Sequence, residues 1–343
     1  MSTLRPSDDA TEAIAQLRAW LEVDDPDQLL IETSGSTGRP KRVLLSREAV
    51  VASVEASARR LGARGQWLLA LPSSYVAGVQ VICRSLLAGH EPVVVDGLDL
   101  TIAEDGQFTS LVPTQLHRLL QDEVQVDALR RLHTILLGGG PIDPALRSRA
   151  EDLGLRLVST YGASETAGGC VYDGLPLDGV ALAVGTDGRL RIGGPTVFDG
   201  YEGDPELTDE TLVDGWFLTS DAGTLDEDGR LRVLGRIDDV VVSGGVNVPL
   251  PAVAKRIREH PDVDAVEVLG VPDEEWGTRV VAFVTLVSTR SSQGSSLLNQ
   301  RSVRDWVAAV NPRAWAPRQV VVLDELPLLP NGKVDRQALR GQA

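Results

Sequence analysis

The stretch HTILLGGGPIDPALRSRAEDLGLRLVSTYG, residues 133–162, contains a complete strand–loop–helix–strand pattern. An apolar run ends in a glycine loop, a segment with helical spacing follows, and a second apolar run ends at Tyr161 and Gly162. Apolar and amphipathic segments alternate in the same way over residues 65–165, which predicts an α/β fold. Ligands bind at the carboxyl ends of strands in such folds, so we expect the loops at 138–141 and 161–169 to lie at a site.

The rest of the chain changes character twice. Residues 180–237 contain β-type segments separated by Asp-Gly turns, which predicts an antiparallel, β-rich subdomain. After Arg236 the pattern is that of a small α+β module of about a hundred residues. The predicted organisation is therefore a large α/β domain over 1–237 and a small, mobile α+β domain over 238–343, with a Ser-rich tether at 288–296.

Composition excludes several classes of protein. A net charge of −16 disfavours nucleic acid and anionic membranes as partners. No stretch approaches the roughly 20 apolar residues of a membrane span, and the N-terminus lacks a signal peptide's apolar region, so we expect no membrane insertion and a cytoplasmic location. Cys83 and Cys170 are expected to be buried free thiols, and the four histidines lack metal-ligand spacing. A homo-oligomer is compatible with these data.

A run of small residues and hydroxyls precedes Lys41. Its backbone N–H groups are unobstructed, so it can wrap a phosphate; its members are Thr33, Ser34, Gly35, Ser36, Thr37 and Gly38. It is not a Walker P-loop, because the Gly-Lys-Ser/Thr spacing fails. Taken alone, an ordinary flexible turn explains it equally well. Only Lys41, Lys255 and Lys333 are lysines among 33 basic residues, which suggests that a lysine after a Gly/Pro turn serves a specific site.

Five ordered motifs give the chain a family resemblance. They are T-S-G-S-T-G-x-P-K at 33–41, Y-G-A-S-E-T at 161–166, D-G-W-F-L-T-S-D at 214–221, G-R-I-D-D at 235–239 and P-N-G-K-V-D-R at 330–336. Together they resemble the signature of the adenylate-forming superfamily, which includes acyl- and aryl-CoA ligases. The resemblance implies a reaction in which a carboxylate attacks the α-phosphate of ATP, with Mg²⁺ as metal and coenzyme A as co-substrate.

The resemblance also assigns roles to residues. Lys333 would stabilise the reacting phosphate, and Glu165 would be catalytic and hold Mg²⁺ as a hard oxygen ligand. Asp238 would be the hinge of the mobile domain. The remaining implied ATP-binding residues are the loop Thr33 to Gly38 with Lys41 for phosphates, Gly139, Gly140, Pro141, Tyr161 and Gly162 for adenine, and Asp221 and Arg236 for ribose.

Departures from the family pattern indicate which branch of the family the chain resembles. Ser220 precedes Asp221 where relatives usually carry glycine, Val246 replaces a frequent Glu, and few residues precede the phosphate loop, as though much of the N-terminal subdomain were absent. Such short chains resemble the o-succinylbenzoate–CoA ligase branch of menaquinone biosynthesis. The segment at 71–86 resembles that branch's acid-binding element, which implies acid-substrate roles for Tyr75, Gly78 and Arg84. Ser164, in the motif at 161–166, is a further expected acid-substrate residue.

Arg84 has two interpretations. Helical spacing places it on one face with Ala77, Gln80 and Val81, where a guanidinium would pair with the unreacted carboxylate of a dicarboxylic acid. Alternatively it lies on the polar face of a surface helix.

The expected activity is ATP-dependent conversion of o-succinylbenzoate and CoA to o-succinylbenzoyl-CoA, AMP and pyrophosphate. Another acyl- or aryl-CoA ligase of the superfamily is the near alternative, and a non-catalytic nucleotide-binding regulator is the distant one.

Overall fold

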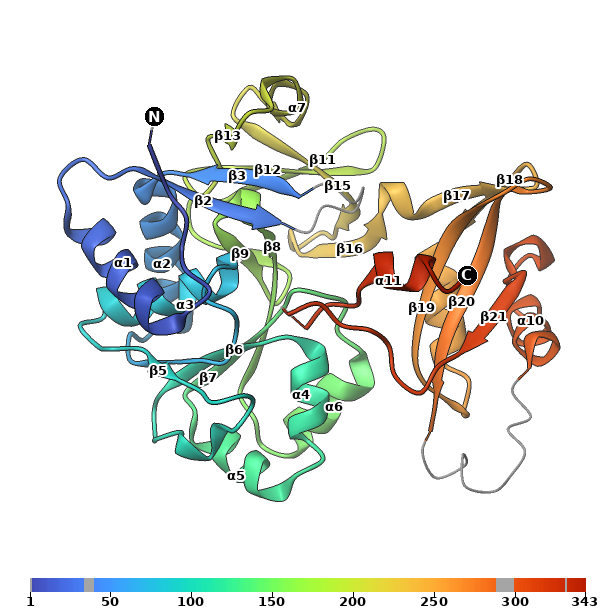
Figure 1. The fold of residues 1–343 in the computed structure, drawn as a ribbon, viewed down its shortest axis with the longest axis horizontal. Coiled ribbons are helices and arrows are strands. Elements are labelled where there is room, and N and C mark those ends of the chain that lie inside the picture. Colours follow the sequence, from blue (N-terminus) through green and yellow to red (C-terminus); the bar gives the residue numbers. More distant parts are fainter. Residues whose placement is uncertain (1, 34–39, 288–298, 331) are drawn as a thin grey trace. The chain divides into compact units, whose positions relative to one another are not determined.

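The computed structural model describes residues 2–33, 40–287, 299–330 and 332–343 (Figure 1). The chain forms two compact units. The first comprises Met1–Thr219, Gly223–Val233 and Pro330–Lys333, and the second comprises Ser220–Ala222, Leu234–Leu329 and Val334–Ala343. The domain boundary expected after residue 237 stays a prediction. In the structure a short C-terminal segment that includes Lys333 packs with the first unit.

A seven-stranded sheet organises the first unit, in the order β10-β9-β8-β7-β6-β4-β5. The strands β5, β4, β6, β7 and β8 run parallel, and β9 and β10 continue the sheet antiparallel. Their bounds are β4 Trp67–Leu69, β5 Val93–Val94, β6 Phe108–Leu111, β7 Thr134–Leu137, β8 Leu157–Ala163, β9 Gly168–Tyr172 and β10 Leu175–Pro176. The α/β prediction is confirmed.

Helices cover both faces of this sheet. Alternate strand residues point to opposite sides, and apolar residues on both sides need to be buried. Ile135 and Leu137 of β7 face one core, whereas Leu136 faces the other. The helices of the first unit and their 3-10 turns are α1 Ala10–Glu22, α2 Arg47–Leu61, α3 Val76–Leu87, η1 Leu100–Ile102, α4 Pro113–Leu119, α5 Glu123–Arg131, α6 Pro144–Asp152, η2 Ser164–Thr166 and α7 Pro205–Thr211. Of these, α3 contacts α1, α2, β4 and β9 and is therefore packed from several sides.

Two smaller sheets lie wholly or mostly in the first unit. One has the order β1-β2-β3-β13, from β1 Thr3–Leu4, β2 Gln28–Thr33, β3 Lys41–Leu45 and β13 Gly200–Tyr201. The other is the predicted antiparallel sheet, which contains β11 Ala181–Val184, β12 Arg189–Gly193, β14 Leu212–Val213, β15 Trp216–Leu225 and β16 Leu231–Arg236. The β-rich character expected for residues 180–237 is confirmed.

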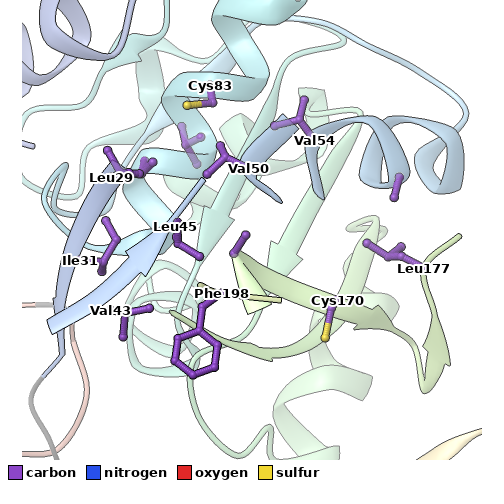
Figure 2. Close-up of a cluster of buried hydrophobic side chains, with 14 of the residues drawn as sticks. Leu29, Ile31, Val43, Leu45, Val50, Val54, Cys83, Cys170, Leu177 and Phe198 are labelled. Carbon is purple, nitrogen blue, oxygen red and sulfur yellow. The ribbon is translucent and has the colours of Figure 1, made fainter. Parts of the chain in front are cut away.

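Figure 2 shows part of the core between β2, β3 and α2, where Val43 lies beside Phe198 and Ile31 and Val50 belong to the same cluster. Cys83 and Cys170 lie in the same cluster as buried free thiols, as expected. Burial raises the pKa of each thiol to about 12, so both remain protonated at neutral pH. None of the helices in the described part of the chain has the length and apolar character that a membrane crossing needs.

The second unit is α+β, as expected. A sheet in the order β19-β20-β21 and a hairpin β17-β18 pack against helices around their own cores. The elements are η3 Ile237–Asp239, β17 Val240–Ser243, β18 Val246–Pro249, α8 Leu250–Arg258, β19 Val263–Asp273, β20 Gly277–Leu286, α10 Gln300–Ala308, η4 Arg313–Trp315, β21 Gln319–Val322 and α11 Arg336–Arg340. The tether predicted at 288–296 lies outside the described residues.

The start of α3 requires a glycine. A Cβ on Gly78 would lie 2.1 Å from the carbonyl oxygen of Pro72, which is backbone and cannot swing aside. We predict that Gly78→Ala lowers the free energy of unfolding by about 1–3 kcal/mol, the usual cost of overpacking. Urea denaturation of the purified protein measures this. Gly140→Ala is the matched control, because a Cβ there meets nothing within 4 Å; equal stability of the two variants would contradict the prediction.

Candidate active site

The candidate active site lies where β6, β7 and β8 end, at the carboxyl edge of the parallel strands. Gly139, Gly140 and Pro141 follow β7 and are exposed, and Tyr161 and Gly162 are among the last residues of β8. Tyr161 is half-buried. The structure thus brings the two loops that the sequence analysis singled out to one edge of the sheet.

An irregularity in the β8–β9 pairing shapes this edge. The register shifts between Tyr161 and Gly162, and a Cβ on Gly162 would lie 2.0 Å from the carbonyl oxygen of Gly168. Only glycine permits such a close approach of two backbones. The shift lets the chain leave the sheet and enter the short turn η2, which carries Glu165.

Glu165 is fixed through both its backbone and its side chain. Its carbonyl oxygen accepts a hydrogen bond from the N–H of Phe198 (2.9 Å), and its Oε1 accepts one from the hydroxyl of Tyr201 (2.8 Å). The side chain sits in a buried position, with the residue 8% exposed. Burial, followed by the neighbouring Glu165 charge, raises the pKa of Tyr201, so the phenol keeps its proton and acts as the donor.

Tyr201 also links Glu165 to the phosphate loop. It lies in β13, where it pairs with Val43 of β3, and the Nζ of Lys41 lies 5.1 Å from the centroid of its ring. Sequence reasoning missed Tyr201. Its partner is 36 residues away in the chain, so no local spacing signals the contact.

The phosphate loop connects the ends of an antiparallel strand pair. Thr33, the last residue of β2, faces Lys41, the first residue of β3. The intervening Ser34, Gly35, Ser36, Thr37 and Gly38 lie outside the described residues, so their expected role stays a prediction.

Lys333 reaches the same edge of the sheet within the first unit. The carbonyl oxygen of Gly332 accepts a hydrogen bond from the hydroxyl of Thr114 at the start of α4 (2.9 Å). The Cε of Lys333 lies 3.5 Å from the position a Cβ would take on Gly139, whose φ of +81° favours glycine. The lysine is exposed. The structure therefore places its stem against the loop that follows β7.

The predicted acid-binding residues lie at the start of α3, near its end and in the β8–β9 turn. Tyr75 caps α3, Gly78 lies in its first turn, and Ser164 begins η2. Arg84 lies near the end of α3 and is 7% exposed, which rules out the surface-helix interpretation. Its Nη2 donates to the Tyr172 hydroxyl (3.3 Å), and its guanidinium carbon lies 5.0 Å from a ring centroid of Trp67.

The sequence analysis placed Ala77, Gln80, Val81 and Arg84 on one face of α3, but the structure shows no single buried face. Ala77 is exposed, whereas every residue from 78 to 85 is buried. A helix packed on several sides does not divide into one polar and one apolar face, because other elements surround it.

Asp221, Arg236 and Asp238 belong to the second unit. Asp221 lies in β15, Arg236 ends β16, and Asp238 lies in η3. Ser220 is an extended residue of β15 and not part of a tight turn, so the glycine that relatives usually carry there is not required by the backbone.

Comparison with known proteins identifies the family. Residues 5–202 match the AMP-binding enzyme family, and residues 253–333 match the AMP-binding enzyme C-terminal domain. The chain belongs to the AMP-binding enzyme family.

Relatives within this family share most of the chain. "Probable 2-succinylbenzoate--CoA ligase" of Mycobacterium tuberculosis is 39% identical over 339 residues, covering 95% of this chain and 87% of the relative. The 2-succinylbenzoate–CoA ligase of Listeria monocytogenes is 30% identical over 332 residues, covering 91% and 69%. A crystal structure of o-succinylbenzoate CoA synthetase from Bacillus subtilis with its acyl-adenylate intermediate has a TM-score of 0.76 at 26% identity, covering 91% and 68%.

The site fits the magnesium ion that this family implies. Mg²⁺ binds through one or two carboxylates, together with substrate phosphates and water. Glu165 would supply one carboxylate, and its Oε1 already accepts a hydrogen bond from the Tyr201 hydroxyl. The described residues contain no group of three or more His, Cys, Asp or Glu that could hold a metal.

We predict that Tyr201→Phe lowers the affinity for Mg²⁺, so that ATP binding requires a higher Mg²⁺ concentration. Loss of the hydroxyl frees the Glu165 carboxylate to rotate, and loss of such an orienting partner typically costs at least about tenfold in metal affinity. Calorimetric titration of ATP at a series of Mg²⁺ concentrations measures the change. Tyr172→Phe is the control, because the Tyr172 hydroxyl bonds to Ser57 and Arg84 and not to Glu165. An unchanged Mg²⁺ dependence in Tyr201→Phe would show that the bond does not orient the carboxylate.

Proposed function

We propose that this chain is an ATP-dependent ligase that converts o-succinylbenzoate and CoA to o-succinylbenzoyl-CoA, AMP and pyrophosphate through an acyl-adenylate. Lys333 contacts Gly139 at the carboxyl edge of the parallel strands, where the turn with Glu165 also lies, and this contact supports adenylate chemistry. The 39% identity to the mycobacterial relative over 95% of the chain supports this acid as the substrate. ATP and CoA are cytoplasmic metabolites, so the proposal implies catalysis in the cytoplasm.

In the first half-reaction, a carboxylate oxygen of the acid attacks the α-phosphorus of ATP and the bond to pyrophosphate breaks. Negative charge accumulates around the transferred group, and a positioned cation lowers the barrier. We assign that cation to Lys333. We assign the β- and γ-phosphate contacts to Thr33 and Lys41, which pair with each other at the two ends of the phosphate loop. A magnesium ion held by Glu165 would neutralise further charge on the triphosphate.

In the second half-reaction, the CoA thiolate attacks the acyl carbonyl and AMP leaves. We assign the adenine contacts to Gly139, Gly140, Pro141, Tyr161 and Gly162. Asp221 and Arg236 are assigned to the ribose hydroxyls. Lys333 must withdraw before the thiol approaches, and we assign the backbone rotation to Asp238 in η3.

Arg84 is the proposed partner of the unreacted carboxylate. A buried cation without a counter-ion is costly, and no carboxylate pairs with Arg84 among the described residues. Its Nε has no hydrogen-bond partner in the described residues, and its other contacts are with the Tyr172 hydroxyl and the Trp67 ring. A dicarboxylic substrate would supply the missing charge.

Pyrophosphate release across a panel of acids, with and without CoA, tests the function. Release with o-succinylbenzoate in preference to monocarboxylic aryl and fatty acids would support it. Preference for another aryl or acyl acid would overturn the substrate assignment while leaving the ligase class intact.

Lys333→Ala is predicted to lose adenylate formation and to retain CoA transfer from pre-made adenylate, because the lysine stabilises developing phosphate charge and does not take part in thiol attack. Each half-reaction is measured separately. Lys255→Ala is the control, since Lys255 is exposed on α8. Equal loss of both half-reactions would refute the assigned role.

For Arg84→Ala we expect the KM for the dicarboxylate to rise about ten- to a hundredfold, the scale of one lost charge-assisted contact of about 1.5–3 kcal/mol. The KM for ATP should scarcely change. Arg84→Met, which keeps more of the side-chain volume beside Trp67, separates lost charge from lost packing. Unchanged dicarboxylate kinetics in both variants would remove Arg84 from the acid site.

A further inference from the structure

Gln80 is a buried amide without a hydrogen-bond partner in the part of the chain that the structure describes. It lies in the middle of α3 and is 1% exposed, and among the described residues neither its Oε1 nor its Nε2 is paired. Burial of such a group without partners costs free energy, and native proteins rarely leave one unpaired. Gln107 provides a contrast within the same unit, since its Oε1 accepts from the N–H of Glu104 and its Nε2 donates to Gln66, both at 2.7 Å.

The side chain of Gln80 lies against the segment that carries Glu165. Its Cγ is 3.2 Å from the position a Cβ would take on Gly168. Gly168 begins β9 and pairs with Ala163, the residue immediately before Ser164. Any larger residue than glycine at position 168 would meet this side chain. The amide therefore sits beside the turn that holds the proposed metal ligand.

Arg84 follows Gln80 by one helical turn on the same side of α3. Its Nε is likewise buried and has no hydrogen-bond partner among the residues that the structure describes. Starting from the Glu165 turn, α3 thus presents first a carboxamide and then a guanidinium. o-Succinylbenzoate carries its polar groups in a matching order: the succinyl carboxylate, then a ketone, then the ring carboxylate.

We propose that the Nε2–H of Gln80 donates a hydrogen bond to the ketone oxygen of the acid, which makes Gln80 a specificity-determining residue. The inference rests on the proposed function, with the succinyl carboxylate reacting beside Glu165 and the ring carboxylate at Arg84. A site built around a buried hydrogen-bonding group rejects an analogue that lacks the matching group, because the protein group is then left unpaired.

The test compares o-succinylbenzoate with the analogue in which the ketone is replaced by a methylene group. The wild-type enzyme should prefer the ketone by about tenfold in kcat/KM, the scale of one hydrogen bond in a closed site. In Gln80→Met, which keeps the side-chain length, the ratio should fall to about one. Turnover of the methylene analogue by this variant shows at the same time that it is folded.

Gln107→Met is the matched control. It removes a buried glutamine whose hydrogen bonds are satisfied, so it should lower the melting temperature and leave the ketone preference intact. Gln80→Met should not lower the melting temperature of the free enzyme, because it removes an unpaired amide from the core.

Three results would overturn the inference. Equal use of both acids by the wild-type enzyme would do so without any variant. So would an undiminished ketone preference in Gln80→Met. An absence of pyrophosphate release with o-succinylbenzoate would overturn the proposed function and this inference with it, whereas the first two results leave the ligase assignment standing.

Discussion

The hydrogen bond from the Tyr201 hydroxyl to the Glu165 carboxylate joins two sheets that the chain builds from distant segments. Tyr201 lies in β13, which pairs with β3, the strand that begins at Lys41. Three residues before Tyr201, the N–H of Phe198 donates a hydrogen bond to the backbone carbonyl oxygen of Glu165. Phe198 is itself anchored in the core beside β2 and β3. The position of the carboxylate is thus set by core packing, and the cost of burying it is reduced by a charge-assisted bond.

This arrangement explains which parts of the molecule the sequence could predict. The strand–helix alternation over residues 65–165 and the Asp-Gly turns after 180 are local signals, and both produced the expected elements. The glycine loop after β7 and the end of β8 met at one edge because parallel strands place their carboxyl ends together. Tyr201 escaped detection because its contact depends on the pairing of β13 with β3, which no local pattern encodes.

The helix α3 shows a different limit of sequence reasoning. Its periodicity predicted a helix, which is confirmed, but the periodicity could not show that other elements surround it. Burial changes the meaning of its polar residues. An arginine on a surface helix needs no explanation, whereas Arg84 and Gln80 bury polar atoms that have no hydrogen-bond partner among the described residues, and such burial costs free energy. Natural proteins tolerate such costs where binding or catalysis requires them.

The same reasoning accounts for the use of lysine in a chain whose other cations are nearly all arginine. At Gly139 the left-handed backbone favours glycine, and the Cε of Lys333 lies 3.5 Å from the position of a Cβ there, an ordinary contact distance. An unbranched stem with a compact ammonium can lie against this backbone and still move its charge, whereas a guanidinium is a planar fork that binds best in fixed bidentate geometry. A cation that must approach the phosphate in one half-reaction and withdraw in the next is therefore better provided by lysine. The role proposed for Lys333 thus depends on a contact with Gly139, which lies 194 positions earlier in the sequence.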